Sequence, residues 1–403
     1  MNKIQTATYY LGLLLFLMSG LLLEACSGDS ASDSRPDNSS SERTVRLSAG
    51  ARQYHVDEAE MASAPGLTRT VTFPSPSSDW TTITPSDNML VFVAKDKENP
   101  SPSDVLSRLF YSMTTDWQSN ITITDAGLDN NYLIYGFMPI DAENVSISLL
   151  STNTNYKAGA TMTIKGLKVL TQTDPCVIVG VGKQETSTSD VTLKWGTFDF
   201  TFKEGTSDVT DYMSILLDHI YSRYHFKVKI DADYAQLRTI RITKMTLEAL
   251  NNDGQTLGSV NATVNIQANT TNSNPLSGVT FSRNVGARMV TLFDKTTTTN
   301  TSYTEGIVLD KINTDFQEAG FCLAPGDQRI FRLNTEYEVY DRENKHIRTN
   351  TVSNTFNTAN FKDKKITNTA PGLEHTIQII VNPTYLYVLS DSDLDNPPFD
   401  INN

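Results

Sequence analysis

The side chains best suited to chemistry are few and far apart in this chain of 403 residues. It contains five histidines and three cysteines, and no cysteine–histidine spacing along the sequence matches a zinc site. There is no G-x-S-x-G elbow for a nucleophilic serine and no glycine-rich phosphate loop. No pair of carboxylates is marked out for glycoside hydrolysis. We therefore expect no enzyme, no cofactor and no metal site. The histidines are His55, His219, His225, His346 and His375.

A short acidic stretch near the C-terminus, Asp391-Ser-Asp-Leu-Asp395, is similar to the start of a calcium loop. Asn396 stands where that loop needs glycine, and Asn402 stands where it needs a bidentate glutamate. An acidic turn without a metal is the better interpretation.

Cys26 lies where the long apolar run of residues 7–25 meets polar sequence. Lys3 provides a short positive region before the run, and Ala25 is the small residue that a signal peptidase needs. A transmembrane helix is the alternative, but the run is short and no basic cluster follows it. Leu23-Glu-Ala-Cys26 resembles a bacterial lipobox, so the sequence predicts a signal peptide at 1–25 and a lipid such as palmitate on Cys26.

The two other cysteines, Cys176 and Cys322, both stand in apolar runs. A disulfide between them is possible, but buried free thiols are favoured because free cysteine packs like a small hydrophobic residue.

The polar residues that follow Cys26 cannot bury enough apolar surface to fold, so we expect a tether at 26–65. Thr44-Val-Arg-Leu-Ser48 alternates and is interpreted there as a detached strand. The net charge of −13 argues against nucleic acid as a partner.

Short alternating segments separated by turn residues fill the rest of the chain. Tyr224-His-Phe-Lys-Val-Lys-Ile230 is typical, with apolar and polar residues taking turns. This pattern predicts an all-β chain of antiparallel sandwiches, with one domain at 66–188 and another at 189–403. Only Ser103–Tyr111 and Tyr212–Tyr221 are predicted to be short helices.

Several segments, taken in order, resemble the fimbrillin superfamily, the pilus subunits of Bacteroides-type bacteria. Besides the lipobox and an arginine-bearing leader, these segments are Tyr132-Leu-Ile-Tyr-Gly-Phe-Met-Pro139, Leu217-Asp-His219 before the strand at 224–230, Leu323-Ala-Pro-Gly326, and Pro371–Val381 continuing through Thr384–Val388.

The resemblance implies two tandem transthyretin-like β-sandwiches and export as a lipoprotein to the outer membrane and cell surface. It also implies cleavage after an arginine of the leader, which would release a first strand and leave a groove for a strand of the next pilus subunit. Arg46, Arg52 and Arg69 are the candidates for cleavage. The alternative is that these arginines only solvate a linker.

The donated strand is expected near the C-terminus. The tail 395–403 is short and carries two prolines, which cannot donate to a sheet. The segment just before it is therefore the candidate donor strand, and an anchor subunit that keeps its lipid is a variant of the same hypothesis. Adhesion to host or bacterial surface ligands is the implied role. The candidate donor residues are Tyr385, Leu386, Tyr387, Val388 and Leu389.

A surface lipoprotein that binds glycans on a β-sandwich, without polymerising, is the alternative function. Three tryptophans are large enough to stack on sugar rings, although tryptophan on a strand more often fills the core. They are Trp80, Trp117 and Trp195.

Overall fold

The computed structural model describes most of the chain between residues 41 and 381. The described residues are 41–56, 80–82, 84–123, 131–151, 153–184, 195–203, 210–230, 232–268, 274–309, 314–326, 329–360, 366 and 369–381. The predictions for the signal peptide, Cys26, Arg69 and the acidic stretch at 391–395 lie outside them. So do all five candidate donor residues, Tyr385, Leu386, Tyr387, Val388 and Leu389.

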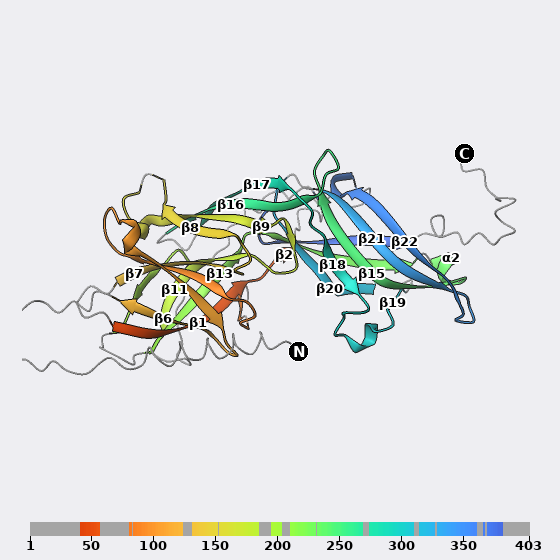
Figure 1. The fold of residues 1–403 in the computed structure, drawn as a ribbon, viewed down its shortest axis with the longest axis horizontal. Helices are drawn as coiled ribbons and strands as arrows, with labels where there is room; N and C mark the ends of the chain where they lie inside the picture. Colours follow the sequence, from red (N-terminus) through yellow and green to blue (C-terminus); the bar gives the residue numbers. More distant parts are fainter. Residues whose placement is uncertain are drawn as a thin grey trace, which may run out of the picture. The chain divides into compact units, whose positions relative to one another are not determined.

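The described residues form strands almost throughout, which confirms the predicted all-β class (Figure 1). The only α-helical segment among them is the four-residue α2 (Ala232–Ala235). None of the described residues belongs to a helix long and apolar enough to cross a membrane. Short 3-10 turns are η2 (Pro102–Asp104), η3 (Tyr156–Ala158), η4 (Thr301–Tyr303) and η5 (Thr358–Asn360).

The largest sheet has nine strands and closes on itself, because β11 pairs with β7 as well as with β13. The closed path runs β11-β13-β1-β6-β5-β4-β7 and back to β11, while β12 and β3 pair with it from the side. We call this path the barrel. The strands of the whole nine-stranded sheet are β1 (Ser41–Arg52), β3 (Trp80–Thr82), β4 (Met89–Lys95), β5 (Val105–Ser112), β6 (Trp117–Ile123), β7 (Asn131–Met138), β11 (Cys176–Gln184), β12 (Asp199–Thr201) and β13 (Thr210–His219).

Three smaller sheets hold the other strands. The first runs β10 (Leu170–Thr171), β20 (Thr314–Leu323), β14 (Ser222–Ile230), β23 (Leu373–Val381) and β2 (His55–Val56). The second runs β18 (Val290–Asp294), β15 (Thr239–Leu250), β21 (Ile330–Tyr340) and β22 (His346–Asn357), with β19 (Ile307–Val308) beside β15. The third runs β17 (Leu276–Val285), β16 (Leu257–Gln267), β9 (Gly159–Lys168) and β8 (Asn144–Leu149).

The alternating pattern of the sequence corresponds to the buried faces of these strands. In β14 the side chains of Tyr224, Phe226, Val228 and Ile230 are buried, while the residues between them are half-buried. The ring of Tyr224 stacks on that of Phe321 with centroids 5.1 Å apart. Aromatic pairing of this kind stabilises a core beyond the burial of area alone.

Both predicted helices are wrong. Residues 105–112 form β5 and residues 210–219 form β13. Every residue of β13 from Met213 to His219 is buried. A strand covered on both faces carries an unbroken apolar run, which periodicity cannot distinguish from a buried helix.

The interpretation of Thr44–Ser48 as a detached strand is also wrong, because the segment belongs to β1 within the barrel. The predicted boundary at 188/189 falls in residues that the structure does not describe, and the division into two domains stays a prediction. Sheet pairings cross that position, since β1 pairs with β13 and β9 pairs with β16.

Gly136 in β7 tests how tightly the barrel is packed. A Cβ placed there would lie 2.7 Å from Ile178 Cδ1 and 2.8 Å from the carbonyl oxygen of Leu90. We expect Gly136→Ala to lower the free energy of unfolding by about 1–3 kcal/mol, the usual cost of overpacking, measured by urea denaturation.

Gly278 in β17 is the matched control, because the nearest atom to a Cβ there is Asn265 Nδ2 at 3.7 Å. Gly278→Ala should stay within about 0.5 kcal/mol of the parent chain. Equal losses from both substitutions would contradict the tight approach at Gly136.

Candidate functional site

Strand β1 is an interior strand of the barrel, although it comes from the segment expected to be a tether. It runs parallel to β13, from Thr44 beside Thr210 to Ala51 beside Leu217. On its other side it pairs antiparallel with β6 over residues 41–47 and with β3 over residues 50–52. The barrel is therefore closed only while β1 is in place.

The inward face of β1 carries a row of apolar side chains that are buried in the barrel. Val45, Leu47, Ala49 and Ala51 are all buried, whereas Arg46 and the other intervening residues from Thr44 to Gly50 are half-buried. Full burial of a valine or leucine side chain contributes about 1.5–3 kcal/mol. The two larger side chains therefore supply most of the apolar stabilisation that β1 brings.

Two buried arginines tie β1 to β13, Arg43 on the inward face of the strand and Arg52, next to Ala51, on the other face. Arg43 Nη1 lies 3.5 Å from Asp211 Oδ2, with side chains 2% and 0% exposed, and it also donates to the carbonyl of Lys203. Arg52 Nη1 lies 3.0 Å from Asp218 Oδ2, with side chains 7% and 3% exposed. A shift of β1 by one residue would turn both guanidinium groups to the other face, so these pairs specify the register.

A second polar group surrounds the end of β1. His219 Nε2 contacts the carbonyl oxygen of Arg52, and His219 Nδ1 lies 2.7 Å from Asp174 Oδ2. The ring of Tyr54 stacks on the imidazole with centroids 3.8 Å apart, and its hydroxyl donates to Asp174 Oδ1 at 2.6 Å. Cys176 Sγ lies 3.4 Å from His219 Nδ1. We call Asp174, Cys176 and His219 the 174/176/219 cluster.

Burial and charge have opposite effects on the pKa of His219 but the same effect on the pKa of Cys176. Burial lowers the pKa of His219, but Asp174, Asp218 and the carbonyl of Arg52 together outweigh it, so the net pKa lies above the ordinary histidine value. Burial raises the pKa of Cys176 well above that of a free thiol, and nearby Asp174 raises it further. Burial likewise raises the pKa of Tyr54. Without a bound cation, Cys176 and Tyr54 are therefore neutral at physiological pH.

The three predicted cleavage sites fall in different places. Arg46 is in the middle of β1, 42% exposed and 3.4 Å from Asp116. Arg52 ends the strand and is buried, with its guanidinium also 5.5 Å from the ring centroid of Trp195. Arg69 lies outside the described residues, as does Cys26. Cleavage itself stays a prediction.

The predicted donor strand is not placed by the structure, because its residues lie beyond the last described one, Val381. Its role as a donor therefore stays a prediction. The residues concerned are Tyr385, Leu386, Tyr387, Val388 and Leu389.

The sequence reasoning missed the acidic partners of β1. Asp211 and Asp218 stand on either side of the apolar run of β13, and their side chains are 0% and 3% exposed. The available signal was a carboxylate at each end of an apolar run. This signal does not identify a partner until the pairing of β13 with the strand that carries Arg43 and Arg52 is known. The expectation that Cys176 and Cys322 are buried free thiols is confirmed.

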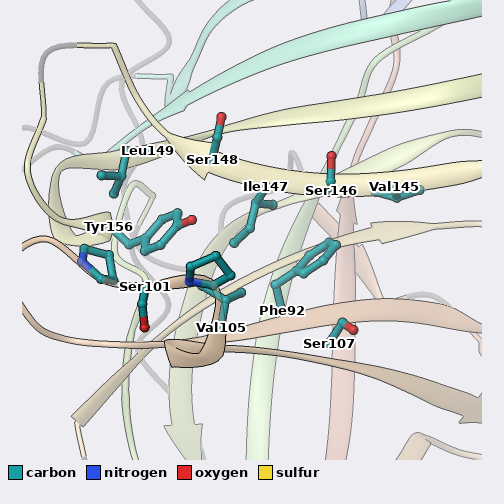
Figure 2. A pocket seen from close by; sticks show the side chains of 12 residues that line it. Phe92, Ser101, Val105, Ser107, Val145, Ser146, Ile147, Ser148, Leu149 and Tyr156 are labelled. Carbon is teal, nitrogen blue, oxygen red and sulfur yellow. The ribbon is translucent and has the colours of Figure 1, made fainter.

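A shallow cavity of about 570 Å³ lies beside β8 (Figure 2). Val145, Ile147 and Leu149 of that strand line it together with Phe92 and Tyr156, and serines stand between them. Two of the tryptophans considered for sugar stacking are core residues, since Trp117 is 0% and Trp195 is 3% exposed. The side chain of Trp80 is not among those described.

No family model matches this sequence, and no curated protein matches it. Among solved structures, the chain is similar to a fimbrial protein from Bacteroides vulgatus, with 13% identity, a TM-score of 0.41 and coverage of 74% of this chain and 89% of that one. It is also similar to the fimbrial anchor protein Mfa2 from Porphyromonas gingivalis, with 9% identity, a TM-score of 0.26 and coverage of 83% and 90%. Both of these solved structures are of fimbrial proteins. Because identities and TM-scores are low, the proposed function rests on the contacts of this chain itself.

The two arginines of β1 provide a matched pair of substitutions. Arg52→Ala leaves the carboxylate of Asp218 buried without its cation, and we expect it to lower the free energy of unfolding by about 3–5 kcal/mol. Arg46→Ala removes a partly exposed pair with Asp116 and should cost about 1 kcal/mol or less. Urea denaturation of both variants measures the difference, and similar losses would mean that the buried pair does not hold β1.

Proposed function

We propose that the chain is a subunit of a surface fimbria and assembles by exchanging β1 for an extended strand of another copy. The observation that supports this most directly is the position of β1. It is the first described strand, it is paired on both sides, and the closure of the barrel depends on it. The proposal includes the two tandem transthyretin-like sandwiches and the non-enzymatic role that the sequence predicts.

Removal of β1 would leave a slot with a defined chemistry. β13 and β6 would each expose a row of unpaired backbone N–H and C=O groups. The positions filled by Val45, Leu47, Ala49 and Ala51 would be open apolar pockets. An extended segment from another chain satisfies both needs at once, as in strand-addition complexes. Because the donor and the acceptor are different surfaces, such contacts do not close on themselves and build a filament.

The proposed donor is the segment 385–389. Leu386 and Val388 stand two residues apart, with Tyr387 between them, just as Val45 and Leu47 of β1 do around Arg46. Side chains of a strand alternate between its faces, so two apolar residues with this spacing can fill neighbouring pockets of the slot. Tyr387 would then point to the opposite face of the donated strand.

Before assembly, the chain would be a lipoprotein of the outer membrane, held by lipid on Cys26. Proteolysis in the leader would then free the subunit to join the fimbria at the cell surface. Adhesion to host or bacterial surface ligands remains the implied role, and a glycan-binding lipoprotein that does not polymerise remains the alternative.

Among the three arginines, Arg69 is the proposed cleavage site. A protease binds its substrate as an extended segment. Both edges of β1 are already paired at Arg46, and Arg52 is buried with one edge paired to β3. We expect Arg69→Ala to stop processing, so that N-terminal sequencing of surface protein no longer finds a start at Thr70. The controls Arg46→Lys and Arg52→Lys keep the charge and should leave processing after Arg69 unchanged. A start at Gln53 in the parent protein would refute this assignment.

A disulfide between β1 and β13 tests strand exchange directly. Ser48 and Ser214 are cross-strand partners, and their hydroxyl oxygens lie 2.7 Å apart. The double variant Ser48→Cys/Ser214→Cys should form a bond that keeps β1 in place, so processed subunits should form fimbriae only after reduction. Electron microscopy and size-exclusion chromatography measure the assembly.

The control is a second disulfide that does not involve β1. Ser259 and Asn284 are partners in β16 and β17, with side-chain atoms 3.4 Å apart. Ser259→Cys/Asn284→Cys should assemble normally under oxidising conditions. If the oxidised variant with the β1 disulfide polymerises as well as this control, β1 is not the exchanged strand. Failure of the parent protein to polymerise after processing would favour the glycan-binding alternative.

A further inference from the structure

The 174/176/219 cluster brings a carboxylate, a thiol and an imidazole together from separate parts of the barrel. Cys176 begins β11 and His219 ends β13, and the two residues are direct cross-strand partners. Asp174 stands just before β11. One ligand atom from each residue lies within 4.8 Å of the other two.

The sulfur–nitrogen distance in the cluster is close to that of a tetrahedral metal site. Zinc binds sulfur at about 2.3 Å and nitrogen or oxygen at about 2.0–2.2 Å. At tetrahedral angles, these bond lengths place a sulfur about 3.6 Å from a nitrogen, and Cys176 Sγ lies 3.4 Å from His219 Nδ1. Asp174 Oδ2, at 2.7 Å from Nδ1, would have to move away by about 0.7 Å to reach the corresponding nitrogen–oxygen separation.

The surroundings of His219 are those of a metal ligand. Its Nε2 contacts the carbonyl oxygen of Arg52, so Nδ1, which faces Asp174 and Cys176, is the nitrogen that can bind a cation after losing its proton. Asp174 is oriented in turn by the hydroxyl of Tyr54 at 2.6 Å. Such outer partners hold metal-binding side chains in position and tune their basicity.

We propose that Asp174, Cys176 and His219 bind a zinc-class divalent cation. The donor set of one sulfur, one nitrogen and one oxygen suits zinc and cobalt and excludes hard cations such as calcium and magnesium. Three protein ligands leave one tetrahedral position for water. Asp174 is 33% exposed, whereas His219 is 3% exposed, so the cation reaches the cluster from the side of the carboxylate. Binding releases to solvent the thiol proton of Cys176 and, from the charged form of His219, the proton on Nδ1.

The site would fasten the end of β1. The imidazole that binds the cation also contacts the last carbonyl of that strand, and so a bound metal would limit the motion of His219 against Arg52. The three ligands belong to β11, to β13 and to the segment just before β11, so they would stay in the subunit when β1 is exchanged. Their outer partners, the Arg52 carbonyl and the Tyr54 hydroxyl, lie in the segment that would leave.

Cobalt binding tests the site, because a thiolate bound to Co²⁺ gives a charge-transfer absorption that oxygen and nitrogen ligands do not. The protein for this test is the full chain with Cys26→Ala, which leaves Cys176 and Cys322 as its thiols. We expect a saturable band at one Co²⁺ per chain that Zn²⁺ displaces. Cys176→Ser should abolish the band, and Asp174→Asn should weaken binding at least tenfold. Circular dichroism of each variant confirms that it is folded.

Two variants that should bind cobalt like the parent protein serve as controls. Cys322→Ser removes the other buried thiol. His225→Gln removes a histidine that pairs with Glu374 at 3.3 Å and belongs to no metal-binding group among the described residues. Both should keep the band and its affinity. Absence of the band in the parent protein would mean that the cluster is only a histidine–carboxylate ion pair, and its loss in Cys322→Ser but not in Cys176→Ser would place any metal elsewhere. Either result overturns the proposal.

Discussion

Closure of the barrel through β1 is the constraint on which the other features depend. A β-sheet that closes has no edge, and a sheet with an edge is open to pairing with other chains. Here the closing strand lies near the start of the described chain, between β13 and β6. The residues that hold it, Arg43 and Arg52, are bound to carboxylates of β13. The barrel is therefore closed, but its closure depends on β1, which precedes all its other strands in the sequence.

The interactions of β1 differ in what they contribute. Its apolar residues supply burial, and Val45 and Leu47 supply most of it. The buried ion pairs contribute less net free energy, because desolvation of the two charges offsets their attraction. Their main effect is to specify the register of β1 and which strand can occupy its place. Any other strand in the slot must pair a cation with Asp211 and Asp218 or leave both carboxylates buried without one. A strand that supplies no cation at these positions binds at a cost.

The strands were predictable wherever one face is buried and the other is not. The alternation of β14 appears in the sequence as Tyr224, Phe226, Val228 and Ile230, and all of these side chains are buried. The same reasoning failed for β13, because burial of both faces removes the alternation. It failed for the 174/176/219 cluster for another reason. Cys176 and His219 meet only through the pairing of β11 with β13, so their spacing in the sequence does not indicate a shared site. The role of Arg52 was likewise hidden, since its partner Asp218 is distant in the sequence.

The order of side-chain sizes along β1 has a consequence for polarity. Valine and leucine occupy the inward positions nearer the start of the strand, and two alanines occupy those nearer its end. The slot that β1 occupies therefore accepts larger side chains at one end than at the other. A strand inserted in the opposite direction would place bulkier side chains at the alanine positions, and extra methylene groups in a packed core cost stability. One orientation is therefore favoured, and subunits joined in this way would all point in the same direction along a fibre.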